Sequence, residues 1–196
     1  MNINDIIAQR VRELRDAQGL TIAALAERSG VSRSNISLIE RGESSATATV
    51  LDKLSAALGV TVAWLFEQAG AAPSPLSRRA DQPEWTDPGS GYVRRNLSPA
   101  AWSPIQLVEV VFPPGQRVIY DTLTRDVDVY QQVWIIEGTM ELTVGDQANN
   151  TAWRLNAGDC LAMGLDQRLA YHNPTDKPAR YIVALVSQAH KPPRRE

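Results

Sequence analysis

The stretch LTIAALAERSGVSRSNISLIERG, residues 20–42, decides the fold of the first part of this chain. Apolar residues recur at helical spacing on both sides of Gly30, which predicts two short helices over residues 22–29 and 33–41. Gly30 allows the positive φ of a tight turn, and the small side chain of Ala26 lets the two helices approach closely. The residues expected to pack between the helices are Leu25, Val31, Ile36 and Ile39.

The residues on either side extend the helical pattern. Further helices are predicted over residues 4–18, 47–58 and 64–66, and the links between them are short. Such links are typical of a compact all-α domain. Within it, residues 22–41 fit a helix-turn-helix unit, and the alternative is an ordinary helical hairpin of a small bundle.

The composition changes after this helical part. All twelve prolines lie at or after Pro73, and all twelve aromatic residues lie at or after Trp64. From residue 105 onward, short runs of β-branched and aromatic residues alternate with turn signals, which predicts at least seven strands in a sandwich or barrel. The predicted organisation is a helical domain over 1–68, a linker with an irregular lead-in strand over 69–104, an all-β domain over 105–188 and a polar tail over 189–196.

The cysteine content and hydropathy indicate the compartment. Cys160 is the only cysteine of the sequence, so an intrachain disulfide is excluded and a reducing compartment fits best. We expect Cys160 to be buried filler rather than a redox sensor. No apolar run approaches the ~18 residues of a membrane span, and the N-terminus lacks the basic region of a secretory signal. These features predict a cytoplasmic protein with no membrane partner.

Residues 4–66 resemble the lambda-repressor-like, or XRE-type, DNA-binding domain. The resemblance is carried by residues 20–42 and by the following LDKLSAALGVTVAWLF, residues 51–66. It implies that the helix from Arg33 to Arg41 enters the major groove of double-stranded operator DNA, where Arg33 would bind a guanine edge and Asn35 an adenine or a phosphate. The residues expected to contact DNA are Ser32, Arg33, Ser34, Asn35, Ser37, Arg41 and Thr47.

The same resemblance implies that Arg15 and Glu40 form a buried salt bridge between the first and third helices. One departure is Ile22, because the family usually carries Gln directly after the N-cap of the second helix. Residues 1–68 hold seven Lys+Arg and eight Asp+Glu, which excludes a protein that coats DNA through bulk positive charge. We therefore expect a homodimer that binds two half-sites about 34 Å apart.

Residues 105–188 resemble a small cupin barrel. The resemblance is carried by PPG at 113–115, QQVWIIEG at 131–138, LNAGD at 155–159 and AYHNPTDKPARYIVAL at 170–185. Counted from these motifs, the metal-ligand positions of cupins fall at Asp121, Leu123, Gln131 and Leu169, and none of them is His. An ion site needs several converging donors, so we expect no metal, no cofactor and no catalytic residue here.

A barrel without a metal can still bind a small molecule. The residues expected to line such a cavity are Asp121, Gln131, Val133, Met163, Leu169 and Tyr171. Their mixture of apolar and polar groups predicts a ligand with an amine or amide group. The alternative is that these side chains simply fill the barrel. Trp134 is expected to point outward, either into an interface or beneath Trp85, Tyr92 or Trp102 of the lead-in segment.

The two resemblances together imply a bacterial transcriptional regulator whose cupin half senses a small molecule. The sequence therefore predicts a non-enzymatic, ligand-responsive, homodimeric regulator. One alternative is a metal-dependent cupin enzyme with a DNA-binding appendage. Another is a phage-type repressor or antitoxin whose C-terminal half serves only dimerisation or partner capture.

Overall fold

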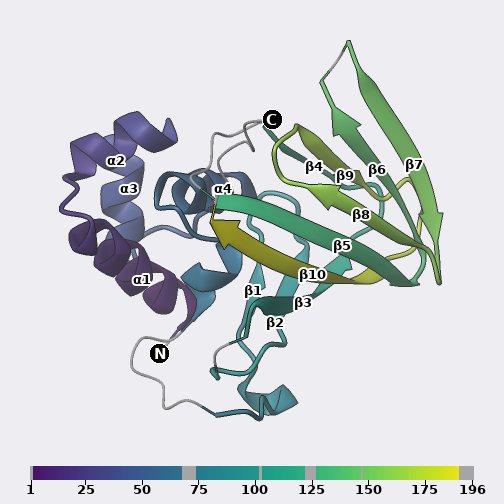
Figure 1. The fold of residues 1–196 in the computed structure, drawn as a ribbon, viewed down its shortest axis with the longest axis horizontal. Coiled ribbons are helices and arrows are strands. Elements are labelled where there is room, and N and C mark those ends of the chain that lie inside the picture. Colours follow the sequence, from purple (N-terminus) through teal and green to yellow (C-terminus); the bar gives the residue numbers. More distant parts are fainter. Residues whose placement is uncertain (1, 68–73, 102, 122–126, 147, 190–196) are drawn as a thin grey trace, which may run out of the picture.

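The computed structural model describes residues 2–67, 74–101, 103–121, 127–146 and 148–189. It has a helical part followed by a β part, as predicted (Figure 1). Helices α1, α2 and α3 lie on the side of the molecule away from the strands, and α4 lies between them and the strands (Figure 1). No helix of the described residues is both long enough and apolar enough to cross a bilayer.

The helical part contains the five predicted helices. They are α1 (Ile3–Ala17), α2 (Ile22–Ser29), α3 (Arg33–Glu40), α4 (Ala48–Ala57) and the 3-10 helix η1 (Val62–Phe66). The side chain of Thr21 caps α2 by accepting a hydrogen bond from the backbone N–H of Ala24. The side chain of Ser32 caps α3 in the same way, with the backbone N–H of Asn35 as donor. Gly30 ends α2 in the left-handed conformation at φ 68°, which glycine adopts without strain. Local signals therefore decide where these helices begin and end.

A buried ion pair fixes α3 against α1. Arg15 Nε donates to Glu40 Oε1 at 2.7 Å, and Arg15 Nη2 donates to Oε2 at 2.9 Å. Arg12 Nη2 also donates to the backbone oxygen of Glu40 at 3.0 Å. The predicted salt bridge between the first and third helices is confirmed.

The β part consists of two antiparallel sheets that enclose an apolar core. The six-stranded sheet has the order β1 (Glu84–Thr86), β2 (Val93–Asn96), β3 (Ile105–Phe112), β10 (Ala179–Ala189), β5 (Val127–Glu137) and β8 (Cys160–Gly164). The four-stranded sheet has the order β4 (Arg117–Tyr120), β9 (Leu169–His172), β6 (Thr139–Gly145) and β7 (Asn150–Asn156). The prediction of an all-β second domain is confirmed.

Residues 84–96 connect the two parts more closely than a linker would. After the short 3-10 helix η2 (Arg79–Asp81), strands β1 and β2 pair with each other, and β2 pairs with β3. Trp85 on β1 packs edge-on against Phe66 of η1 and against Tyr92, with 5.7 Å between ring centres in both cases. Asn96 Nδ2 donates to the backbone oxygen of Ala63 in η1 at 3.2 Å. The helical part therefore packs directly on the edge of the six-stranded sheet.

Two predictions about side-chain burial are corrected by the strand register. Cys160 is exposed rather than buried, because it pairs with Trp134 on the outer face of the six-stranded sheet. Trp134 points outward as predicted and is 50% exposed, so the lead-in segment does not bury it. Trp85 and Tyr92 pack against η1 and β3 instead, and Trp102 lies outside the described residues.

Candidate functional sites: an exposed helix and an interdomain cavity

The first turn of α3 presents polar side chains to solvent. Ser32, Arg33 and Ser34 are exposed, whereas Asn35 and Ser37 are half-buried. The opposite face of the helix, with Ile36 and Ile39, is buried in the core. Arg33 forms no ion pair with any other described residue, so its guanidinium can reach a partner outside the chain. The structure therefore brings five of the predicted DNA-contacting residues together at one end of α3.

Arg41, at the other end of α3, is held within the chain. Its Nε and Nη2 donate to the two carboxylate oxygens of Glu43, both at 2.8 Å, and its Nη1 donates to the Ser37 hydroxyl. The hydrogen bond from Arg41 lowers the pKa of Glu43, and Glu43 raises the pKa of Arg41. A phosphate that binds Arg41 must therefore compete with Glu43.

Thr47 does not join this group. It caps α4, where the backbone N–H of Ala48 donates to Asp87 Oδ1 of the β part at 2.9 Å. Its methyl group lies beside Gly89 in the same loop. The N–H groups that would attract a phosphate at this helix start thus face a carboxylate of the chain itself.

A cavity of about 90 Å³ lies between the helical part and the interior of the β part. Helix α4, η1 and the residue before η1 contribute Ala48, Asp52, Thr61, Val62 and Ala63 to its wall. The remaining lining comes from strands of both sheets and the loops beside them. The alternative of a completely filled barrel interior does not describe this structure, since a cavity of this size holds several water molecules.

Four of the six predicted cavity residues line this space: Asp121, Gln131, Leu169 and Tyr171. Val133 is absent from the lining because it is fully buried in the core further along β5. Met163 is also absent, and it pairs with Gln131 on the edge strand β8. The sequence therefore predicted which residues of β5 face the interior, but it did not predict how far the cavity extends along this strand.

Several of the polar groups that line the cavity are hydroxyls, and they come from Thr61, Tyr92, Tyr120, Tyr171 and Tyr181. Gln131 Nε2 donates to the Tyr171 hydroxyl at 3.0 Å, and the hydroxyls of Tyr92 and Tyr120 lie 3.2 Å apart. Burial raises the pKa of Tyr92, Tyr120 and Tyr171, so these phenols stay protonated at neutral pH. The cavity thus offers hydrogen-bond donors and acceptors without a phenolate charge.

Sequence reasoning missed two charged residues of the wall, Asp52 on α4 and Arg94 on β2. Arg94 is the cation of the two. Its guanidinium carbon lies 5.4 Å from the ring centre of Phe66. Burial lowers the pKa of Arg94, because a desolvated cation is disfavoured. Nothing in the sequence singles out Arg94, and only the pairing of β2 with β3 reveals that it lies inside whereas Arg95 faces outward.

The positions that hold a metal in cupins do not fit a divalent ion here. Leu169 has no donor atom, and the amide of Gln131 is bonded to Tyr171. Asp121 is largely exposed and lies 3.8 Å from Arg168 Nε, while Leu123 is outside the described residues. His172 faces away from the cavity, as predicted, and its Nδ1 lies 3.1 Å from Glu141 Oε2. Within the described ranges, no three His, Cys, Asp or Glu side chains form a metal-binding group.

Comparisons with known proteins support a helix-turn-helix domain in the helical part of the chain. The helix-turn-helix family HTH_3 matches residues 11–65. The HTH-type transcriptional regulator SinR of Bacillus subtilis (strain 168) is 36% identical over 64 residues, which is 32% of this chain and only 58% of SinR. The control protein C.SmaI of Serratia marcescens is 37% identical over 70 residues, which is 36% of this chain and 83% of that protein.

The two-part fold also occurs in a solved structure. The HTH_3 family transcriptional regulator from Vibrio cholerae superposes with a TM-score of 0.72 at 23% identity, covering 94% of this chain and 96% of that chain. This likeness concerns the fold alone. The exposed α3 and the ion pair behind it are consistent with a helix-turn-helix domain. The match over residues 11–65 and the sequence match to most of the C.SmaI protein place the chain in the helix-turn-helix family HTH_3.

Proposed function

We propose that this protein is a sequence-specific, DNA-binding transcriptional regulator, that it acts as a homodimer, and that its interdomain cavity receives a small-molecule effector. The observation that carries the proposal is the exposed polar first turn of α3 in an HTH_3 domain. The positive end of a helix and its hydroxyl groups suit phosphate, and an unpaired arginine suits a guanine edge. No catalytic group is assigned, because Gln131 and Leu169 stand at positions where cupin chemistry needs metal ligands.

In this proposal, Arg33 and Ser34 reach base edges in the major groove. Ser32, Asn35 and Ser37 lie beside them and bind phosphates or the edges of neighbouring bases. Arg41 and Thr47 have lesser roles in DNA binding. Arg41 is already bonded to Glu43, and the start of α4 that Thr47 caps is already bonded to the β part. Specific contacts carry most of the affinity, since residues 1–68 have no net positive charge.

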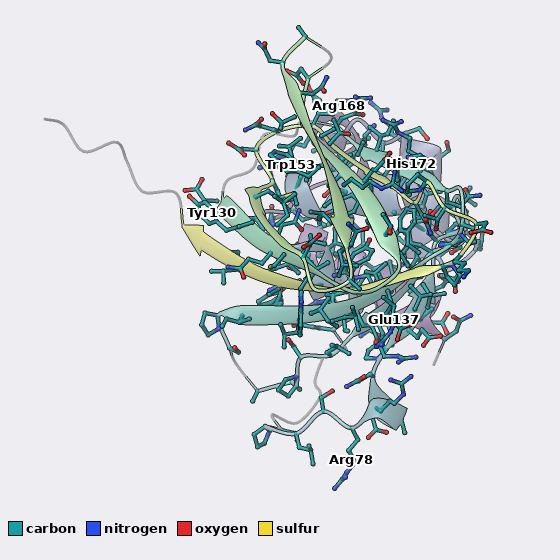
Figure 2. The ribbon with its side chains drawn as sticks, turned by 90° about the vertical axis from the view of Figure 1, so that its right-hand side faces the viewer. Arg78, Tyr130, Glu137, Trp153, Arg168 and His172 are labelled. Carbon is teal, nitrogen blue, oxygen red and sulfur yellow. The ribbon has the colours of Figure 1, made fainter. Side chains whose placement is uncertain are left out.

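Removing the Arg33 guanidinium is expected to weaken operator binding by roughly 1–3 kcal/mol and to relax the preference for one base. An operator is first selected from random duplexes with the full chain, and Arg33→Ala is then titrated against it and against single-base variants. The matched control is Arg78→Ala, which removes an exposed arginine in the segment that projects from the β part (Figure 2). Equal losses of operator affinity in the two variants would show that α3 does not form the DNA interface.

The homodimer is supported by the outer face of the six-stranded sheet. Tyr130 and Trp134 on β5 are 55% and 50% exposed, and they share this face with exposed apolar residues of β3, namely Ile105, Leu107 and Val111. A contiguous exposed apolar surface is typical of a protein interface. A second copy of the chain is the occupant that fits, because operator binding with so little net charge needs two half-sites.

Placing a charge in the middle of this surface is expected to separate the dimer. Light scattering after gel filtration should give about twice 21.5 kDa for the wild type and 21.5 kDa for Trp134→Lys. Trp153→Lys is the control, since Trp153 is also exposed but lies on β7 of the other sheet (Figure 2). A wild-type monomer, or a Trp134→Lys variant that stays dimeric, would contradict this interface.

The effector role is supported by the composition of the cavity wall. Residues of α4 and η1 close a cavity whose other walls belong to the β part. A molecule bound there contacts both parts at once and favours whichever relative placement fits it best. The orientation of α3 follows, because α1 and α4 pack against η1 and the ion pair of Arg15 and Glu40 holds α3 to α1.

A further inference from the structure

Among the described residues that line the cavity, Arg94 is the only arginine. Its Nε and Nη2 atoms have no hydrogen-bond partner among the described residues and almost no surface open to solvent. The residue as a whole is only partly buried, so its accessible surface belongs to atoms other than these two. An unpaired buried cation is costly, and native structures normally pair or hydrogen-bond such groups.

Other arginines of the same chain show what this edge of a guanidinium binds. Arg15 and Arg41 each direct Nε and Nη2 to the two oxygens of one carboxylate, at 2.7 to 2.9 Å. Arg95, the next residue of β2, points to the opposite face and pairs with Glu84 and Glu109. The two N–H groups on this edge match a carboxylate in geometry as well as in charge. At Arg94 the same edge lacks its carboxylate.

We infer that the cavity binds a small monocarboxylate with an apolar body, and that its carboxylate pairs with Arg94. This inference rests on the proposed effector role of the cavity. The apolar body would lie against Val110, Phe112, Val129 and Leu169, which line the same space.

A single negative charge fits better than two. Asp52 and Asp121 also belong to the wall, and they repel a second anionic group. The polar groups of Asp121, Gln131 and Tyr171 led to the expectation of a ligand with an amine or amide group. The inference replaces that group by a carboxylate, because the Gln131 amide is bonded to Tyr171 and the cation of Arg94 repels an amine. The protonated hydroxyls of Tyr92 and Tyr120 can donate to a carboxylate without adding charge.

The experiment compares acids with their neutral isosteres. Butyrate, isovalerate, benzoate and phenylacetate, each with its carboxamide, are tested on the full chain without DNA by thermal denaturation and titration calorimetry. At least one acid is expected to raise Tm and to bind at least tenfold more tightly than its amide. If no acid binds, or if amides bind as well as acids, the inference is overturned. Since no DNA is present, the outcome is independent of the operator-binding test.

Two arginine variants locate the binding group. Arg94→Met keeps the bulk of the side chain without its charge and is expected to abolish the preference for the acid. Arg95→Gln removes the neighbouring cation on the opposite face of β2 and is expected to leave that preference unchanged. A preference that survives in Arg94→Met would overturn the assignment. Should Arg94→Met fail to fold, the comparison of acid with amide on the wild type still decides whether an anion is bound.

Discussion

Replacing Glu40 by alanine is expected to lower the free energy of unfolding of the helical part by about 3–5 kcal/mol. The Glu40 side chain is only 4% exposed and receives both hydrogen bonds from the Arg15 edge. Without the carboxylate, Arg15 Nε and Nη2 stay between α1 and α3 without their acceptor, and only Nη1 keeps its partners, Asp16 and the backbone oxygen of Leu20. The penalty comes mainly from these two buried donor groups, since a buried pair contributes little net stability by itself.

The measurement is chemical denaturation followed by the circular dichroism of the helices. Glu43→Ala is the control, because it removes the carboxylate from an equally well-formed pair with Arg41 that is solvent-exposed. That variant should unfold close to the wild type, as exposed ion pairs contribute little. The double variant Arg15→Met/Glu40→Met should recover much of the loss. Equal stabilities of Glu40→Ala and Glu43→Ala would mean that burial does not matter here.

The helical part was predictable because its signals are local. Thr21 and Ser32 are caps, Gly30 is a turn residue, and the apolar residues between them recur at helical spacing. None of these inferences needs a distant partner. The salt bridge of Arg15 and Glu40 came instead from a family resemblance, because nothing within either helix alone selects the other.

The β part was predictable in outline and less so in detail. Its two sheets follow from alternating apolar runs, but the side chains that lie inside depend on strand register between distant segments. For this reason Arg94 was missed as a residue of the cavity wall, and Cys160 was wrongly expected to be buried. Arg94 is turned inward by pairing of β2 with β3, and Cys160 is turned outward opposite Trp134. The hairpin β1–β2 was hidden because Trp85, which stabilises it, packs against a ring from the other part of the chain.

The second large effect is expected at Trp85. This side chain is 2% exposed, and truncation to alanine should cost about 3–5 kcal/mol, since deletion of a buried aromatic ring leaves a cavity that the surroundings fill only partly. Its Nε1 has no hydrogen-bond partner among the described residues, so packing rather than polar contact carries the loss. Thermal denaturation measures it, with Trp153→Ala as the exposed control on the other sheet.

The position of Trp85 also makes it a test of communication between the two parts. Ring contacts run without interruption from η1 to the cavity wall, through Phe66, Trp85, Tyr92, Phe112, Tyr181, Tyr171 and Tyr120. If cavity occupancy alters the placement of the helical part through this contact, Trp85→Leu should still bind DNA and the acid separately. The acid should then change operator affinity much less than it does in the wild type. An undiminished change in that variant would assign the coupling to the direct contact of α4 with the cavity instead.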